Sequence, residues 1–138
     1  MNENTERAKQ ILLESGSTFV LINGSRVFTS NGRAVATLMQ LLKEDRLLLS
    51  GSYIADRVIG KAAAMMMHYG GANEVYASTI SETAIVYFEK HGIPFFFDQK
   101  VPNIQNRDRS GLCPMERLCL EINCSQMAYE KIKDFLNA

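Results

Sequence analysis

The feature that most constrains the fold is an alternation of strand-like and helix-like segments between residues 53 and 98. Runs rich in β-branched and aromatic residues alternate there with runs whose apolar residues recur at helical spacing. The segments are a strand at 53–59, a helix at 60–69, a strand at 74–80, a helix at 81–91 and a strand at 93–98. Strands joined by helices pair in parallel within one sheet, and the helices pack on its faces. Three consecutive Phe residues in the last segment predict a strand buried on both faces.

A β-hairpin is predicted before this alternating region. Strands at 18–22 and 25–29 flank Asn23-Gly24, a pair that tolerates the positive φ angles of a tight turn. Further helices are predicted at 4–14, 33–44, 113–122 and 125–136. The 138 residues have the length of one domain, and no repeat or linker divides them. We therefore expect one domain over residues 1–138, a three-layer α/β/α sandwich with a mixed sheet.

The composition argues against several classes of partner. Fifteen basic and fifteen acidic residues give a formal net charge of zero, which argues against binding of nucleic-acid phosphates. No segment approaches the roughly 20 apolar residues of a membrane span, and the polar start lacks the apolar core of a signal peptide. Three cysteines without regular spacing favour reduced thiols. We expect a cytoplasmic protein with neither a nucleic-acid nor a membrane partner.

The predicted topology brings several helix N-termini to one edge of the sheet. In parallel strand–helix units each helix begins just past the carboxyl end of a strand, where open α/β sheets bind their ligands. The helices that begin at Gly60-Lys61 and at Ser81 should share this edge, and the helix at Cys113 is a candidate third. The sequence therefore predicts a ligand site at this edge.

Cys113 is the strongest candidate for chemistry. Pro114 and Glu116 follow it as a helix-start signature, which places the thiol at the N-cap. The helix dipole and free backbone N–H groups at that position favour a nucleophilic thiolate, and Arg107 and Arg109 would act in the same direction. The alternative is that Cys113 only caps the helix while Glu116 closes its capping box.

Lys61 and the loop before Cys113 are candidate ligand contacts. A Gly-Lys pair at a helix start can hold an anion through backbone N–H groups and an ammonium, although this segment lacks the P-loop pattern. The alternative to an anion contact is that Lys61 is solvated or pairs with Asp56. Asn106, Arg107 and Asp108 supply polar side chains beside the same edge, or form a solvated turn.

The sequence shows no metal site and implies no cofactor. Cys119 lies on the apolar stripe of its helix and is predicted to be a core residue, whereas Cys124 follows that helix without an evident partner. His68 and His91 lie at helix ends and are expected to be structural. A protein zinc site needs three or four clustered ligands, and no such spacing is present.

Several of these segments together resemble a known family. They are Ala55-Asp56-Arg57-Val58-Ile59-Gly60-Lys61-Ala62-Ala63, Glu74-Val75-Tyr76-Ala77, Ile80-Ser81-Glu82, Asn106-Arg107-Asp108 and Gly111-Leu112-Cys113-Pro114-Met115-Glu116. The set resembles a small prokaryotic family of unknown function, which suggests a bacterial protein. The resemblance implies the cytidine deaminase-like fold and no established activity.

The zinc deaminases of that fold carry a His- or Cys-x-Glu motif and a Pro-Cys-x-x-Cys motif at the starts of two central helices. Their places fall near residues 60–62 and 80–84 of this chain, where no zinc ligand set is present. Deaminase activity is therefore not expected.

Two functions of different class remain. The first is binding of a small anionic or nucleotide-like ligand by Gly60, Lys61, Ser81, Asn106, Arg107 and Asp108. The second is a zinc-independent enzyme with Cys113 as nucleophile or redox thiol and with Asp56 or Glu116 as the proton-transfer group. A homo-oligomeric scaffold that associates through an exposed side of the Met-rich helix 60–69 is a further alternative.

Overall fold

The computed structural model describes residues 1–105 and 111–137, which form seven helices and five strands. In chain order the elements are α1 (Glu3–Glu14), β1 (Phe19–Asn23), β2 (Arg26–Ser30), α2 (Ala34–Glu44), α3 (Arg46–Leu49), β3 (Tyr53–Ile59), α4 (Lys61–Gly70), β4 (Glu74–Ser81), α5 (Glu82–His91), β5 (Phe95–Val101), α6 (Pro114–Cys119) and α7 (Ser125–Leu136). The strands form one sheet in the order β2-β1-β3-β4-β5. β1 is antiparallel to both of its neighbours, whereas β3, β4 and β5 are parallel. The predicted mixed sheet with a parallel portion is confirmed.

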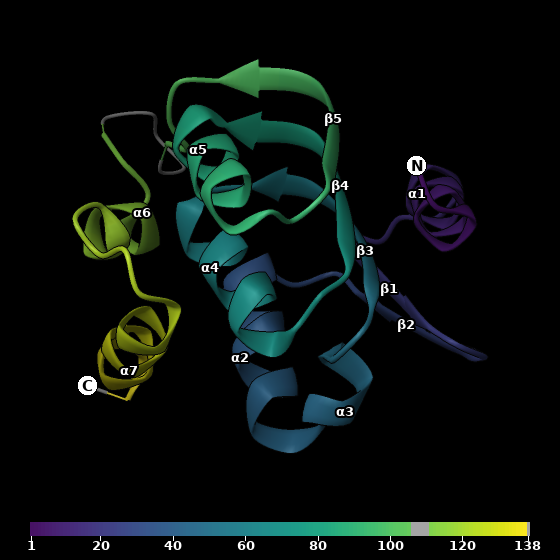
Figure 1. The fold of residues 1–138 in the computed structure, drawn as a ribbon, viewed down its shortest axis with the longest axis horizontal. Helices are drawn as coiled ribbons and strands as arrows, with labels where there is room; N and C mark the ends of the chain where they lie inside the picture. The colour runs from purple at the N-terminus through teal and green to yellow at the C-terminus, as the bar shows by residue number, and fades with distance from the viewer. Residues whose placement is uncertain (106–110, 138) are drawn as a thin grey trace.

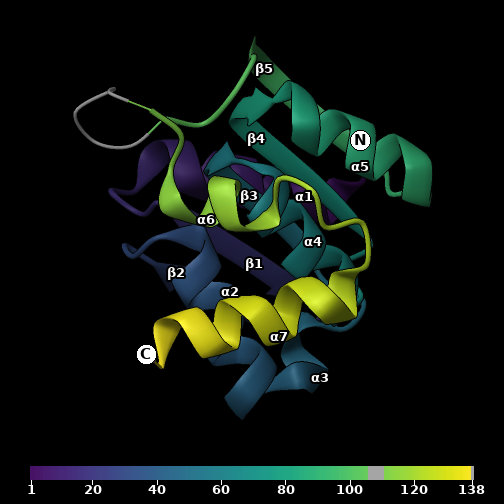
Figure 2. The same ribbon diagram turned by 90° about the vertical axis from the view of Figure 1, so that its left-hand side faces the viewer.

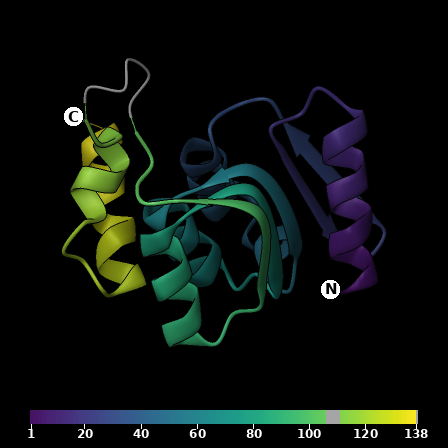
Figure 3. The same cartoon turned by 90° about the horizontal axis from the view of Figure 1, so that it is seen from above.

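Helices cover both faces of the sheet (Figure 1). α1 lies alone on one face, over β1 and β3, while α2, α4 and α5 lie on the other. α6 and α7 pack on the outer side of α4, and Figures 2 and 3 show them as a further layer away from the sheet. The parallel connections β3-α4-β4 and β4-α5-β5 put both helix starts at the carboxyl edge of the sheet, as the sequence predicts.

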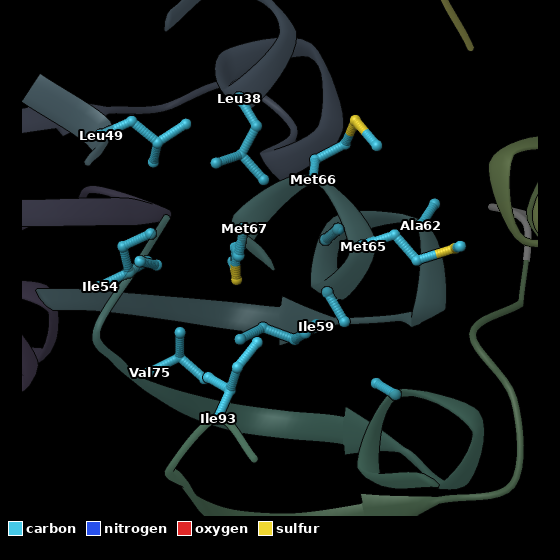
Figure 4. Packing of buried hydrophobic residues seen from close by; sticks show 14 of the residues in the cluster. Leu38, Leu49, Ile54, Ile59, Ala62, Met65, Met66, Met67, Val75 and Ile93 are labelled. Atoms are coloured by element: carbon cyan, nitrogen blue, oxygen red, sulfur yellow. The ribbon is translucent and has the colours of Figure 1, made fainter. Parts of the chain in front are cut away.

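α4 is the centre of the larger core. All residues from Ala62 to Met67 are buried, and Met65, Met66 and Met67 have no exposed surface. The three Met side chains extend in different directions from the helix and fill the space among its neighbours (Figure 4). Unbranched Met side chains suit such irregular gaps, and the three Ala residues allow close approach. The expectation of an exposed side on this helix is wrong, because α6 and α7 cover the side that faces away from the sheet.

β5 differs from its prediction. Residues 96–100 of this strand are exposed and only its two ends are half-buried, so a strand buried on both faces is wrong. The physical reason is its position, because β5 lies at the edge of the sheet and only β4 pairs with it in the described structure. Three Phe residues in a row indicate a strand, but they do not indicate its place in the sheet.

Three local features also differ from the sequence expectations. The hairpin is confirmed, but its two-residue loop is Gly24-Ser25, because Asn23 pairs with Arg26 and Gly24 takes the positive φ of 61°. The short helix α3 was not predicted, and it begins where a carboxylate oxygen of Asp45 accepts a hydrogen bond from the N–H of Leu48 at 3.3 Å. α6 ends at Cys119, three residues before the predicted end.

Among the described residues, no helix is both long enough and apolar enough to cross a bilayer. The cytoplasmic location stays a prediction.

Candidate functional site

The carboxyl edge of β3 and β4 carries the starts of α4 and α5, and both starts are capped from within the chain. Ser81 is fully buried, and its hydroxyl accepts a hydrogen bond from the N–H of Ala84 at 3.1 Å. Gly60 is the N-cap residue of α4 and has no side chain to offer, so the free N–H groups of α4 need another acceptor.

Glu116 supplies that acceptor from α6. Its two carboxylate oxygens accept hydrogen bonds from the backbone N–H groups of Lys61 at 2.8 Å and Ala62 at 2.9 Å. A Cβ atom on Gly60 would collide with this carboxylate and displace it, so glycine allows the close approach. Burial raises the pKa of the Glu116 carboxyl, and the two N–H donors and the charge of Lys61 oppose the rise. The anion position at the start of α4 is therefore filled by the chain itself.

No ion pair joins the ammonium of Lys61 to this carboxylate in the described structure. The ammonium donates a hydrogen bond to the carbonyl of Leu120 at 3.0 Å, at the end of α6, where a cation is favourable. Lys61 lines a cavity of about 430 Å³ along α5, together with Glu82, Tyr87 and Lys90 among others. It does not line the larger cavity described next.

A second cavity, of about 770 Å³, lies between the start of α2, the carboxyl end of β3 and the start of α6. Most of its lining surface is apolar and polar side chains contribute the rest, as is typical of small-molecule sites. The polar residues in its lining, together with Cys113 and Gly60, are Thr18, Asn31, Arg33, Asp56, Arg57, Gln105 and Glu116.

Asp56 is the most unusual residue of this cavity. Its side chain is 3% exposed and extends from β3, the central strand of the sheet. One carboxyl oxygen accepts a long hydrogen bond of 3.5 Å from the N–H of Val58, while the other, Oδ2, has no partner among the described residues. Burial raises the pKa of Asp56 to about 8, and hydrogen bonds from the backbone of Val58 and Arg57 oppose the rise only in part.

The neighbouring Arg57 does not neutralise Asp56. Its guanidinium donates hydrogen bonds to the carbonyls of Ser17 at 2.9 Å, Leu12 at 2.8 Å and Ser15 at 3.3 Å. These contacts tie β3 to the end of α1, on the opposite face of the sheet from α4. Successive residues of a strand point to opposite faces, which accounts for the separation of the two charges.

The start of α2 forms another wall of the cavity. Arg33 is its N-cap residue, makes no side-chain hydrogen bond to the first turn, and is exposed. The first turn carries no acidic residue, and Ala34 and Val35 line the cavity. Backbone N–H groups at an uncapped helix start, with a guanidinium beside them, form an environment that favours an anion.

Cys113 is the N-cap residue of α6, as predicted, and is half-buried in the lining of the same cavity. Glu116 does not close a capping box on α6 but reaches across to α4. Cys119 is fully buried, which confirms it as a core residue, and burial raises the pKa of its thiol to about 11. Cys124 is exposed at the start of α7.

The two histidines pack together with Tyr87. His68 Nδ1 and the Tyr87 hydroxyl share a hydrogen bond of 2.6 Å, and the rings of His68 and His91 are 4.5 Å apart. Burial lowers the pKa of His68, and the charge of His91 lowers it further. Within residues 1–105 and 111–137, no three His, Cys, Asp or Glu side chains come close enough together to hold a metal ion.

The structure thus brings some of the predicted site residues together and separates others. Asp56, Gly60, Cys113 and Glu116 line one cavity, whereas Lys61 lines the other cavity and Ser81 is a buried cap. The predicted contacts Asn106, Arg107 and Asp108 lie outside the described residues.

Sequence reasoning missed the part of the cavity that comes from Thr18, Asn31, Arg33 and Gln105. The antiparallel pairing of β1 with β3 sets Phe19 opposite Asp56, which brings Thr18 to the cavity. For Asn31, Arg33 and Gln105, the only local signal in the sequence is the turn Ser30-Asn31-Gly32, which is followed by Arg33 at a helix start.

Comparison with known proteins identifies the family. A family model named TM1506 and described as "Domain of unknown function (DUF1893)" matches residues 7–136. The chain belongs to the DUF1893 family. The expectation of a family of unknown function is confirmed.

The DUF1893 fold is also known from a crystal structure. The DUF1893 family protein TM1506 from Thermotoga maritima matches with a TM-score of 0.86 and 24% sequence identity, over 97% of this chain and 91% of that chain. At this level of identity the match shows a shared fold. A search of curated proteins gives no match.

Proposed function

We propose that this DUF1893 protein binds a small anionic or nucleotide-like molecule in the 770 Å³ cavity between α2, β3 and α6. The volume falls within the range of about 300–1,000 Å³ that is usual for small-molecule sites. The cavity also lies at the carboxyl edge of the parallel strands, the usual place for ligands in open α/β sheets.

The single observation that carries the proposal is the buried Oδ2 of Asp56, which has no hydrogen-bond partner among the described residues. A buried polar atom without a hydrogen bond costs free energy, on the order of 1–3 kcal/mol, and is therefore uncommon in folded proteins. Asp56 is buried on the wall of a cavity large enough for a ligand. A ligand with a polar group at this point would supply the missing hydrogen bond.

The anionic end of the ligand is assigned to the start of α2. There the N-cap residue Arg33 makes no side-chain hydrogen bond to the first turn and adds a positive charge. The starts of α4 and α5 suit an anion less well, because Glu116 and Ser81 already cap them. Lys61 is also engaged, by the carbonyl of Leu120. The proposed contacts are therefore Asp56 and Arg33, which both line one cavity.

Two other expectations from the sequence stay predictions. They are the cytidine deaminase-like assignment of the fold and a thiol reaction at Cys113. Cys113 and Asp56 line the same cavity, so a bound ligand would lie near both side chains.

The proposal is tested by calorimetric titration with nucleoside monophosphates, sugar phosphates and inorganic phosphate. We expect at least one organic phosphate to bind the wild-type protein. Asp56→Leu and Arg33→Gln should each weaken that binding, by about tenfold for Asp56→Leu, because each removes one polar contact. Leu has the same number and branching of side-chain heavy atoms as Asp and no polar atom, so Asp56→Leu should retain the fold.

Arg7→Gln is the matched control, because Arg7 is exposed on α1, on the other face of the sheet. Its affinity should equal that of the wild type. Absence of binding across the whole panel would refute the proposal. Binding that neither Asp56→Leu nor Arg33→Gln weakens would refute the assignment of the ligand to this cavity.

A further inference from the structure

β5 presents an unpaired strand edge among the described residues. In the described structure it pairs with β4 on one side only, and its seven residues contain neither Gly nor Pro. Phe96 and Phe97 are 37% and 40% exposed, on opposite faces of the strand. A long, regular edge strand with exposed apolar residues is a template for pairing with another strand.

The hydrogen-bond pattern identifies which backbone groups are free. The carbonyl of Pro94 accepts a hydrogen bond from the N–H of Val75 in β4 at 3.1 Å. In a parallel pair, alternate residues direct both N–H and C=O to the same neighbour, so Phe96, Asp98 and Lys100 also face β4. The backbone groups of Phe95, Phe97, Gln99 and Val101 therefore point to the open edge.

The charges on β5 favour one register for pairing with β5 of a second copy. Antiparallel self-pairing centred on Asp98 would set Asp98 against its own copy, and pairing centred on Lys100 would set Lys100 against its own copy. Pairing centred on Phe97 leaves Asp98 opposite Phe96. Pairing centred on Gln99 sets Asp98 opposite Lys100 twice, once on each side of the two-fold axis.

The backbone fits this register. With Gln99 at the centre, residues with outward N–H and C=O groups face each other and can exchange hydrogen bonds, namely Gln99 with Gln99 and Phe97 with Val101. Asp98 and Lys100 then form the pairs without mutual backbone hydrogen bonds, in which opposing side chains are closest. Pro102 would lie opposite Phe96. The backbone groups at both positions point away from the new strand, so the missing N–H of Pro102 costs no hydrogen bond between the two copies.

The Asp98 side chain is already held in place for such a contact. One of its oxygens accepts a hydrogen bond from the Tyr76 hydroxyl at 2.5 Å, and the other has no hydrogen bond within the described residues. The opposite edge of the sheet offers no comparable pairing. β2 has five residues, and its only charged one, Arg26, is bonded to Asp45 at 2.8 Å.

We propose that two copies of this chain form a dimer by antiparallel pairing of their β5 edges, centred on Gln99, with Asp98 of each copy opposite Lys100 of the other. The two sheets then form one continuous sheet. The ligand cavity lies on the far side of β3 from this edge, so the dimer does not depend on the proposed ligand.

Charge reversal tests the register. Sedimentation equilibrium of the wild type should show a dimer that dissociates on dilution. Asp98→Lys and Lys100→Asp each create two like-charge pairs and should raise the dissociation constant about tenfold. The double variant Asp98→Lys/Lys100→Asp restores both opposite pairs and should restore dimerisation. Lys131→Glu, at an exposed position on α7, is the control and should change nothing.

Gln99→Pro tests the backbone independently. It removes an N–H that points to the open edge and none that bonds to β4, so the monomer should fold while the dimer is lost. A monomer at all concentrations up to millimolar would overturn the proposal. Single reversals that dimerise as well as the wild type, or a double variant that fails to recover, would overturn it also.

Discussion

At the scale of single residues, two buried acids line the larger cavity, and their surroundings differ. Glu116 has both oxygens satisfied by backbone N–H groups at the start of α4. Asp56 has one long hydrogen bond and one oxygen without a partner in the described structure. The charged groups that share its cavity are Arg33, Arg57 and Glu116, and the guanidinium of Arg57 is engaged on the other face. Asp56 is therefore held in its neutral form near pH 7.

This predicts a specific dependence of stability on pH. The pKa of Asp56 is about 8 in the folded chain and about 4 in an unfolded one. Below about pH 4 both states hold the proton, and the contribution of Asp56 to stability is fully present. Between about pH 4 and pH 8 only the folded state holds it, so stability falls by up to about 1.4 kcal/mol per pH unit.

Asp56→Asn tests this dependence, because Asn resembles the protonated acid and does not titrate. Urea unfolding of both proteins at several pH values measures the difference in their free energies of unfolding. We expect the variant to gain stability relative to the wild type as the pH rises from 4 to 8. A difference that stays constant over this range would contradict the assigned pKa.

At the scale of elements, α4 depends on α6 for its cap. The contact joins residues that are 55 positions apart in the chain, so local sequence patterns do not reveal it. Gly60 has φ −102°, which any residue adopts, so the preference for glycine comes from the Glu116 carboxylate, which holds the atoms nearest to a Cβ at this position.

A double-mutant cycle measures this dependence. Glu116→Ala should cost about 1–2 kcal/mol, as the loss of a helix cap does. Gly60→Ala should cost a similar amount in the wild type, because the new methyl group displaces the carboxylate. In the Glu116→Ala background the same Gly60→Ala change should cost little, since nothing remains for the methyl group to displace. Additive costs, measured by urea unfolding, would show that the two residues act independently.

The elements themselves were largely predictable, whereas the site was predictable only in part. Periodicity of two or 3.6 residues marks strands and helices locally, which is why β3, α4, β4 and α5 match their predictions. The exposure of β5 depends on the order of strands in the sheet, which no single segment encodes. Asp56, Cys113 and Glu116 stood out by residue type and position. Arg33 did not, because its role depends on the pairing of β1 with β3 and on the packing of α6.

At the scale of the whole molecule, the C-terminal helix completes the core. α7 packs against α4, and Ala128 and Ile132 of α7 are fully buried in the same cluster as the Met residues. Tyr129 stacks on Tyr69 with ring centres 4.9 Å apart, and the Arg46 guanidinium lies over both rings. Helices from the middle and from the C-terminal end of the chain thus bury one core against the sheet, so we expect residues 1–138 to unfold as a single unit.

Ile132→Ala tests this cooperativity. If α7 belongs to the same unit as the sheet, the free energy of global unfolding should fall by about 2–4 kcal/mol, the usual cost of a buried Ile. Met127→Ala is the matched control on the same helix, because Met127 is 52% exposed and should change stability by less than about 0.5 kcal/mol. Far-ultraviolet circular dichroism and tyrosine fluorescence should report coincident transitions for both variants. An early transition of Ile132→Ala in fluorescence alone would instead show that α7 detaches before the sheet unfolds.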